Sequence, residues 1–213
     1  MPWDSRRTLY LVTPPSRADA GEILDVVARV LAVAPERVAV QYRSKTSSAQ
    51  DQLEMARRLA LLCAACRVPF LVNDRLDVAL AAGADGVQLP ADGVSIAEAR
   101  MLMPPPKIVG ASTHSAAEAK SRAGADFVVL GPVFETPSKR QYGAPLGLEV
   151  LFEAAHRSSV PVVAIGGIRA ARAAEVARTG CSGLACISEV FASGDPASAA
   201  LALIREFDRG RFA

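Results

Sequence analysis

Short runs of apolar residues recur along the whole chain, and each is followed by an alanine-rich segment with helical periodicity. Most runs are apolar throughout, which is typical of parallel strands buried on both faces. Regular alternation of strand and helix predicts an α/β domain with a parallel sheet. The expected strands are Leu9–Val12, Val38–Gln41, Phe70–Val72, Gly86–Leu89, Ile108–Ala111, Phe127–Leu130, Val162–Ile165 and Leu184–Ile187.

Eight such units in 213 residues favour a single (β/α)8 TIM barrel over an open sheet. A doubly wound sheet is the alternative, but its G-x-G-x-x-G fingerprint is absent after the first run. No stretch rich in proline, glycine or serine divides the chain, so we expect one domain over residues 1–213.

The helix boundaries carry their own signals. Ser95 with Glu98, and Ser115 with Glu118, have the S-x-x-E spacing of a capping box. Three similar phrases place a glycine between an expected helix and the next strand, where glycine can adopt the left-handed conformation that ends a helix. These glycines are Gly83, Gly124 and Gly180.

Composition excludes several classes of protein. The formal net charge is +2, and no basic block is interleaved with aromatic residues, so we expect neither nucleic-acid nor membrane-surface binding. No apolar run reaches the roughly 18 residues of a membrane span. The segment Met1 to Arg7 is polar, unlike a signal peptide, which favours the cytoplasm. The sequence fixes no oligomeric state, and a homo-oligomer is compatible with it.

Cys63 and Cys66 form a C-x-x-C motif, the spacing of a redox pair or of half a metal site. They lie inside a helical pattern, and no second pair follows at zinc-finger spacing. We therefore interpret them as small core residues of a helix.

Polar and charged residues gather where the expected strands end. In a TIM barrel these positions converge on one site. Arg43, Lys45 and Lys139 supply positive charge for phosphate oxygens. Gly166 and Gly167 allow backbone N–H groups to approach an anion closely. Asp74 is a candidate ligand for Mg²⁺, which takes one or two carboxylates together with substrate phosphates.

Taken together, these motifs resemble the thiamine phosphate synthase and TenI superfamily. The resemblance rests on Gln41-x-Arg43-x-Lys45, Asn73-Asp74-Arg75, Ser112-Thr113-His114, Gly131-Pro132 through Thr136-x-Ser138-Lys139, Ile165-Gly166-Gly167-Ile168 and Ile187-Ser188. It extends from Leu9 to the last helix with compatible spacing. It implies a transferase that joins 4-amino-2-methyl-5-hydroxymethylpyrimidine diphosphate to thiazole phosphate, giving thiamine phosphate and diphosphate.

The resemblance also implies a role for each matching residue. The pyrimidine diphosphate would be held by Gln41, Arg43, Lys45, Asn73 and Lys139 and contacted by Ser112. The thiazole phosphate would be held by Thr136, Ser138, Gly167, Ile187 and Ser188, and Mg²⁺ by Asp74. Arg43 and Lys139 would stabilise the departing diphosphate. This chemistry requires charge stabilisation, and the sequence carries no nucleophile motif such as G-x-S-x-G.

The sequence departs from the synthase pattern after the fourth expected strand. Synthases carry a second metal-binding aspartate there, and Gly93 occupies its position in Leu89-Pro90-Ala91-Asp92-Gly93. Asp92 is the candidate replacement as second Mg²⁺ ligand.

Two alternatives stay open at this point. The stretch Val87-Gln88-Leu89-Pro90 is more similar to the TenI-type thiazole tautomerases, which aromatise thiazole phosphate carboxylate without metal or diphosphate. There a histidine at the position of His114 carries the proton, as imidazole can near neutral pH. The second alternative is a non-catalytic protein that binds thiazole phosphate. The presence of Gln41, Arg43, the Asn73-Asp74 pair and Lys139 favours the synthase, because a tautomerase does not need a diphosphate site, whereas Gly93 favours the tautomerase; we favour the synthase.

Overall fold

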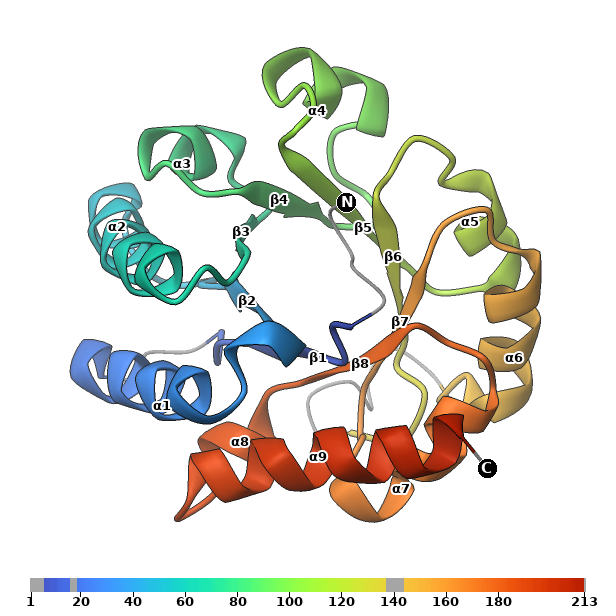
Figure 1. Ribbon diagram of the computed structural model, residues 1–213. Helices are drawn as coiled ribbons and strands as arrows, with labels where there is room; N and C mark the ends of the chain where they lie inside the picture. The colour runs from blue at the N-terminus through green and yellow to red at the C-terminus, as the bar shows by residue number, and fades with distance from the viewer. Residues whose placement is uncertain (1–5, 16–18, 137–143, 213) are drawn as a thin grey trace.

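The computed structural model describes residues 6–15, 19–136 and 144–212. Its strands form a closed, parallel barrel in which each strand pairs with its neighbours in sequence and β8 pairs with β1 (Figure 1). The strands are β1 (Leu9–Val12), β2 (Val38–Tyr42), β3 (Phe70–Asn73), β4 (Gly86–Leu89), β5 (Ile108–Thr113), β6 (Phe127–Leu130), β7 (Val162–Ile165) and β8 (Gly183–Cys186). The expected TIM barrel is confirmed.

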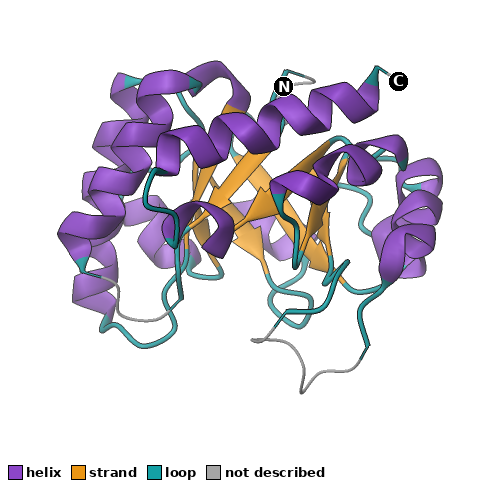
Figure 2. Cartoon of the chain, turned by 90° about the horizontal axis from the view of Figure 1, so that it is seen from below, coloured by secondary structure: helices purple, strands orange, loops and turns teal. Residues whose placement is uncertain are grey.

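Helices surround the strands on all sides (Figures 1 and 2). They are α1 (Ala20–Val33), α2 (Ala49–Ala65), α3 (Leu76–Ala81), α4 (Ile96–Leu102), α5 (Ala116–Ser121), α6 (Gly147–Arg157), α7 (Ala170–Arg178), α8 (Ser188–Phe191) and α9 (Pro196–Arg211), with a 3-10 turn η1 (Pro35–Arg37). The last helix, α9, packs across α7 and α1 and so closes the ring. Within the described residues, no helix is both long and apolar enough to cross a membrane.

The expected helix signals have physical counterparts. Ser95 and Glu98 form a complete capping box at the start of α4. The glycines at the three helix ends all have positive φ, with values of 70° at Gly83, 96° at Gly124 and 79° at Gly180. These three residues thus adopt the left-handed conformation that the sequence predicted.

The buried residues divide into two clusters because strand side chains point alternately inward and outward. The outer cluster joins one face of each strand to the helices, as Leu11 and Val40 do. The inner cluster fills the barrel itself and includes Tyr10, Leu71 and Phe127, the first and last of which meet edge to face. Side chains two residues beyond this inner cluster must therefore point into the barrel near its C-terminal end.

At the N-terminal end of the barrel, two aspartates make the same kind of contact with the backbone of an adjacent strand. Asp85 accepts a hydrogen bond from the backbone N–H of Phe70 at 2.8 Å, and Asp126 accepts one from Val109 at 2.7 Å. The backbone N–H of each aspartate is in turn bonded to the carbonyl of the same partner residue. Asp126 also forms a 2.6 Å ion pair with Arg100, whose side chain is only 21% exposed.

This difference between the two aspartates yields a stability prediction. Asp126→Ala should lower the free energy of unfolding by about 2–3 kcal/mol, because it leaves a backbone donor unpaired and removes the carboxylate that pairs with the partly buried Arg100 guanidinium. Asp85→Ala should lower the free energy of unfolding by only about 1–2 kcal/mol, since it leaves just the backbone donor without its partner. Urea denaturation of both variants measures the difference. Equal losses would show that the Arg100 ion pair contributes nothing to stability.

Candidate functional site

At the C-terminal end of the barrel, the inward-facing positions form two contrasting halves. Strands β2 to β5 contribute amide and hydroxyl side chains, whereas β7 and the residue after β8 contribute isoleucines that pack on the inner cluster. The polar half is made by Gln41, Asn73, Gln88 and Ser112, and the apolar half by Ile165 and Ile187. The mouth of the barrel can therefore receive a hydrogen-bonding group on one side and an apolar ring on the other.

Hydrogen bonds order the polar half. Gln41 donates from Nε2 to Oδ1 of Asn73 at 2.8 Å, across the β2–β3 pair. Gln88 donates from Nε2 to Oγ of Ser112 at 3.2 Å, across the β4–β5 pair. Both glutamines are almost fully buried, with 4% and 2% of their surface exposed. Their side chains are thus fixed before any ligand binds.

Arg43 is held at the rim by its backbone. Its N–H donates to Oγ1 of buried Thr13 at 2.9 Å, and that hydroxyl donates back to the Arg43 carbonyl at 3.2 Å. The guanidinium is half-buried, and desolvation lowers the pKa of Arg43 from its ordinary value. No carboxylate among the described residues pairs with it, so the charge is available for an anion.

Asp74 follows β3 in a strained backbone conformation. Its φ is +66°, a region that residues with a side chain rarely adopt. Its N–H is bonded to the Gln88 carbonyl at 2.9 Å, and its carboxylate is exposed. The backbone thus turns this carboxylate outward at the rim, next to the polar half.

The loop after β4 explains the departure at Gly93. A Cβ atom at this position would lie 2.7 Å from Cγ of Pro90 and 2.9 Å from its Cδ. Because a proline ring cannot rotate away, a side chain at position 93 requires the loop to change. The candidate replacement, Asp92, is exposed in the same loop. Among the described residues, no group of three or more His, Cys, Asp or Glu side chains could hold a metal ion.

The glycine pair after β7 packs against the loop after β6. The φ angles are +102° at Gly166 and +64° at Gly167. A Cβ at Gly167 would lie 2.7 Å from the Glu135 carbonyl oxygen and 2.7 Å from Cβ of Phe134. The Phe134 N–H donates to the Gly166 carbonyl at 3.0 Å. Only glycine permits this approach, which ties the loops after β6 and β7 together.

His114 lies just after β5 and is exposed. Its Nδ1 is 2.7 Å from the Gly131 carbonyl oxygen, which can only accept a hydrogen bond, so Nδ1 carries the proton. Nε2 is then the unprotonated nitrogen of the neutral ring. Glu118 accepts from the His114 N–H at 2.8 Å instead of completing a capping box with Ser115. Ser115 caps α5 as expected, with its hydroxyl accepting from the Glu118 N–H at 3.1 Å, and only the reciprocal bond of the box is replaced by the one from His114.

Of the other residues predicted from the sequence, four lie beyond strand ends. Lys45 and Ser188 are exposed, and Thr136 and Ile187 are half-buried. Ser112 lies inside β5, because that strand continues to Thr113 and not only to Ala111 as expected. Ser138 and Lys139 lie outside the described residues.

Sequence reasoning missed three contributors: the support of Arg43 by Thr13, the block at Gly93 by Pro90, and the hydrogen bond from Gln88 to Ser112. Gln88 alone had a local signal, since it is a lone polar residue in an otherwise apolar strand.

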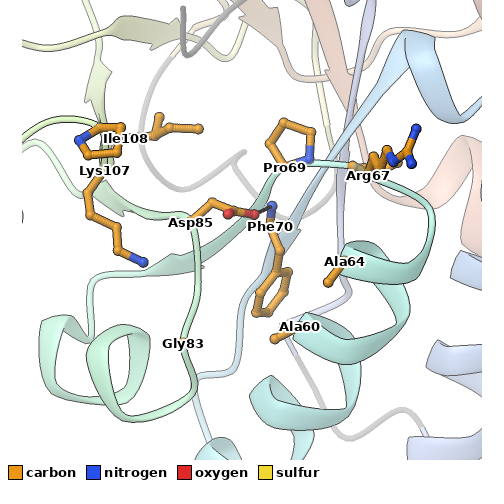
Figure 3. A pocket seen from close by; sticks show the side chains of 11 residues that line it. Ala60, Ala64, Arg67, Pro69, Phe70, Gly83, Asp85, Lys107 and Ile108 are labelled. Carbon is orange, nitrogen blue, oxygen red and sulfur yellow. Dashed lines mark hydrogen bonds between the residues drawn. The ribbon is translucent and has the colours of Figure 1, made fainter.

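A separate cavity of about 480 Å³ lies at the opposite end of the barrel (Figure 3). Its walls come from α2 and the starts of β3 and β5, and include Arg67, Phe70 and Lys107. Two charged side chains in this wall already have backbone partners: Asp85 accepts from the Phe70 N–H, and Lys107 donates to the Ala84 carbonyl. The cavity is thus remote from the residues that the sequence selected.

Cys63, Cys181 and Cys186 lie in the hydrophobic core, and Cys66 packs against it. All four are free thiols, and Cys63 is buried on α2 beneath the barrel wall. Burial raises the pKa of the Cys63 thiol to about 12, so the reactive thiolate is absent near neutral pH. The structural interpretation of the C-x-x-C motif is consistent with this burial.

The fold is that of the TIM-barrel enzymes, whose active sites lie at this end of the barrel. The family described as "Thiamine monophosphate synthase" matches residues 9–190. Over 92% of both chains, the sequence is 40% identical to a putative thiamine-phosphate synthase of Geobacter sulfurreducens. It is 43% identical, again over 92% of both chains, to a thiamine-phosphate synthase of Methanoculleus marisnigri.

A solved structure gives the same result. The thiamine phosphate pyrophosphorylase of Pyrococcus furiosus superposes with a TM-score of 0.83 and 32% identity, over 97% of this chain and 98% of that one. The chain belongs to the thiamine monophosphate synthase family.

Proposed function

We propose that this protein is a thiamine-phosphate synthase, which joins a pyrimidine methyl diphosphate to thiazole phosphate. The observation that carries the proposal is the two-sided mouth of the barrel, with fixed amides and a half-buried arginine on one side and isoleucines with a glycine pair on the other. Family membership supports it, as does the name shared by relatives about 40% identical over most of their length.

In the proposed reaction, the bond between the pyrimidine methylene carbon and the diphosphate oxygen breaks, and the thiazole nitrogen forms the new C–N bond. Gln41 and Asn73 orient the pyrimidine diphosphate, with Ser112 in contact with it. Arg43, Lys45 and Lys139 stabilise the negative charge of the leaving diphosphate, the effect that usually dominates such catalysis. Thr136, Ser138, Gly167, Ile187 and Ser188 hold the thiazole phosphate against the apolar half.

The donor set fits Mg²⁺ bound mainly through the substrate. Asp74 offers one carboxylate at the rim, and Asp92 lies in the neighbouring loop. Mg²⁺ is commonly bound by one or two carboxylates together with substrate phosphates. When bound, it would supply charge neutralisation for the diphosphate. Arg43, which follows the neighbouring strand β2, would add to that neutralisation.

The direct test is diphosphate release by the purified protein given pyrimidine methyl diphosphate, thiazole phosphate and Mg²⁺, with thiamine phosphate identified by mass. Release that requires all three supports the synthase. Absence of release in protein that binds thiazole phosphate would contradict it. Proton exchange on thiazole phosphate carboxylate, dependent on His114, would then indicate the tautomerase.

The clash at Gly93 gives a prediction for metal binding. Gly93→Asp alone should not tighten Mg²⁺ binding, because the new Cβ meets the Pro90 ring. The double variant Pro90→Ala, Gly93→Asp relieves that contact and adds a carboxylate, so its Mg²⁺ affinity should rise by roughly tenfold, about 1.4 kcal/mol. Calorimetric titration of Mg²⁺ in the presence of diphosphate measures this, with Pro90→Ala as control. No gain over the control would show that position 93 does not face the metal.

A further inference from the structure

Gln88 is a buried polar residue whose amide is only half satisfied. It lies in the middle of β4 between Val87 and Leu89, points into the barrel and is 2% exposed. Its Nε2 donates to Ser112, but its Oε1 has no hydrogen-bond partner among the described residues. A buried acceptor without a partner lowers stability, so its presence requires a reason.

The packing around Gly110 favours this orientation of the amide. A Cβ at Gly110 would lie 2.3 Å from Oε1 of Gln88 and 2.6 Å from Cζ of Phe127. The amide oxygen therefore rests against the Gly110 Cα and beside the rim of the Phe127 ring. Aromatic rims carry partial positive charge and Cα–H groups are weak donors, so both favour an oxygen here over an NH₂ group.

This orientation decides what Ser112 can do. A serine hydroxyl has one proton to donate and can accept at its lone pairs. Because Oγ accepts from Gln88, it keeps its own proton for another partner, and the Ser112 side chain makes no other hydrogen bond among the described residues. Ser112 is half-buried at the polar half of the mouth, so this proton is available to a ligand bound there.

We propose that Gln88 is a positioning residue that fixes the Ser112 hydroxyl as a donor toward an acceptor atom of the pyrimidine diphosphate. The inference rests on the proposed function, in which Ser112 contacts that substrate. Gln88 itself does not touch the substrate and acts through Ser112. The unpaired Oε1 is the structural cost of this arrangement, and Gly110 provides the space for it.

A double-mutant cycle tests the proposal. The variants are Gln88→Leu, Ser112→Ala and their combination, and the readout is the dissociation constant of the pyrimidine diphosphate measured by calorimetry. Each single variant should weaken binding by roughly fivefold to tenfold, the effect of one hydrogen bond. The combination should be no weaker than Ser112→Ala alone, because Gln88 has no effect without the hydroxyl. Multiplying effects, or unchanged binding in Gln88→Leu, would overturn the proposal.

Thermal denaturation separates this role from a structural one. Gln88→Leu removes the unpaired acceptor in a similar volume, so its Tm should equal or exceed that of the wild type. A lower Tm with unchanged binding would mean that Gln88 serves the fold only. Gln88→Met, which is unbranched, provides a second apolar variant if leucine does not fit beside Gly110.

The outcomes distinguish this inference from the proposed function. Wild-type protein that binds the pyrimidine diphosphate without turnover would defeat the synthase proposal, while the cycle would still decide the role of Gln88. Turnover with an additive cycle would defeat only the role of Gln88. Wild-type protein that does not bind the pyrimidine diphosphate would overturn both.

Discussion

Replacing Arg43 with alanine is expected to lower kcat/KM for the pyrimidine diphosphate by about 10²–10³-fold. A charge-assisted hydrogen bond contributes about 1.5–3 kcal/mol, and a guanidinium can donate two such hydrogen bonds to the same phosphate group. The half-buried position of Arg43 reduces screening by water, and its backbone is fixed to Thr13, so its guanidinium starts from a defined place at the rim. Steady-state kinetics with diphosphate detection measures the loss.

Arg43→Ala should lose activity without losing stability. Arg43→Ala removes a partly desolvated charge that no described carboxylate neutralises, so Tm should be unchanged or higher. Arg43→Lys keeps the charge but not the paired N–H groups, and about a tenfold loss of kcat/KM is expected. Arg58→Ala, an exposed arginine on α2, is the control and should leave kcat/KM unchanged. A loss below tenfold in Arg43→Ala would remove Arg43 from the diphosphate site.

The barrel could be predicted because its pattern is repeated locally in the sequence. Each strand is a short apolar run and each helix carries its own stripe or cap, so no long-range information was needed. The strand ends were less accurate. The expected strands stop before the polar residues Asn73, Ser112 and Thr113, yet these three stay in the strand ladder, paired with Gln88, Val129 and Leu130.

The bounds of β8 also differ from those expected. The expected strand Leu184–Ile187 is in fact Gly183–Cys186, because Gly183 pairs with Val163 of β7. The neighbouring strand, and not the run of apolar side chains, determines where β8 begins and ends. Hydrogen-bond partners supplied by another strand override local preference, and they cannot be read from one segment of sequence.

For the candidate site, the sequence identified individual residues but not the contacts between them. Arg43 could be selected from its charge and its place after an expected strand, since strand ends of a barrel converge, and Gln41 from the family resemblance. The contact between Gln88 and Gly110 joins two residues that only strand pairing brings together. The same holds for the loops after β6 and β7, where Gly167 meets Glu135. Steric complementarity of this kind needs coordinates.

That close contact makes Gly167→Ala the variant with the largest expected loss of stability. The residue has φ +64°, and a Cβ would lie 2.7 Å from both the Glu135 carbonyl oxygen and Phe134 Cβ. A left-handed alanine costs about 1–2 kcal/mol, and the overlap adds about 1–3 kcal/mol because backbone atoms must move. The free energy of unfolding should fall by the sum, roughly 2–5 kcal/mol.

Gly83→Ala is the matched control, because Gly83 has φ +70° and nothing lies within 4 Å of its added Cβ. It should show the conformational cost alone, so the difference between the two variants in urea denaturation isolates the overlap. The site readout is KM. In Gly167→Ala the KM for thiazole phosphate should rise at least about tenfold, while Gly83→Ala, at the other end of the barrel, leaves it unchanged. If both variants lose equal stability and keep wild-type KM, the loop after β7 neither packs on the β6 loop nor binds the phosphate.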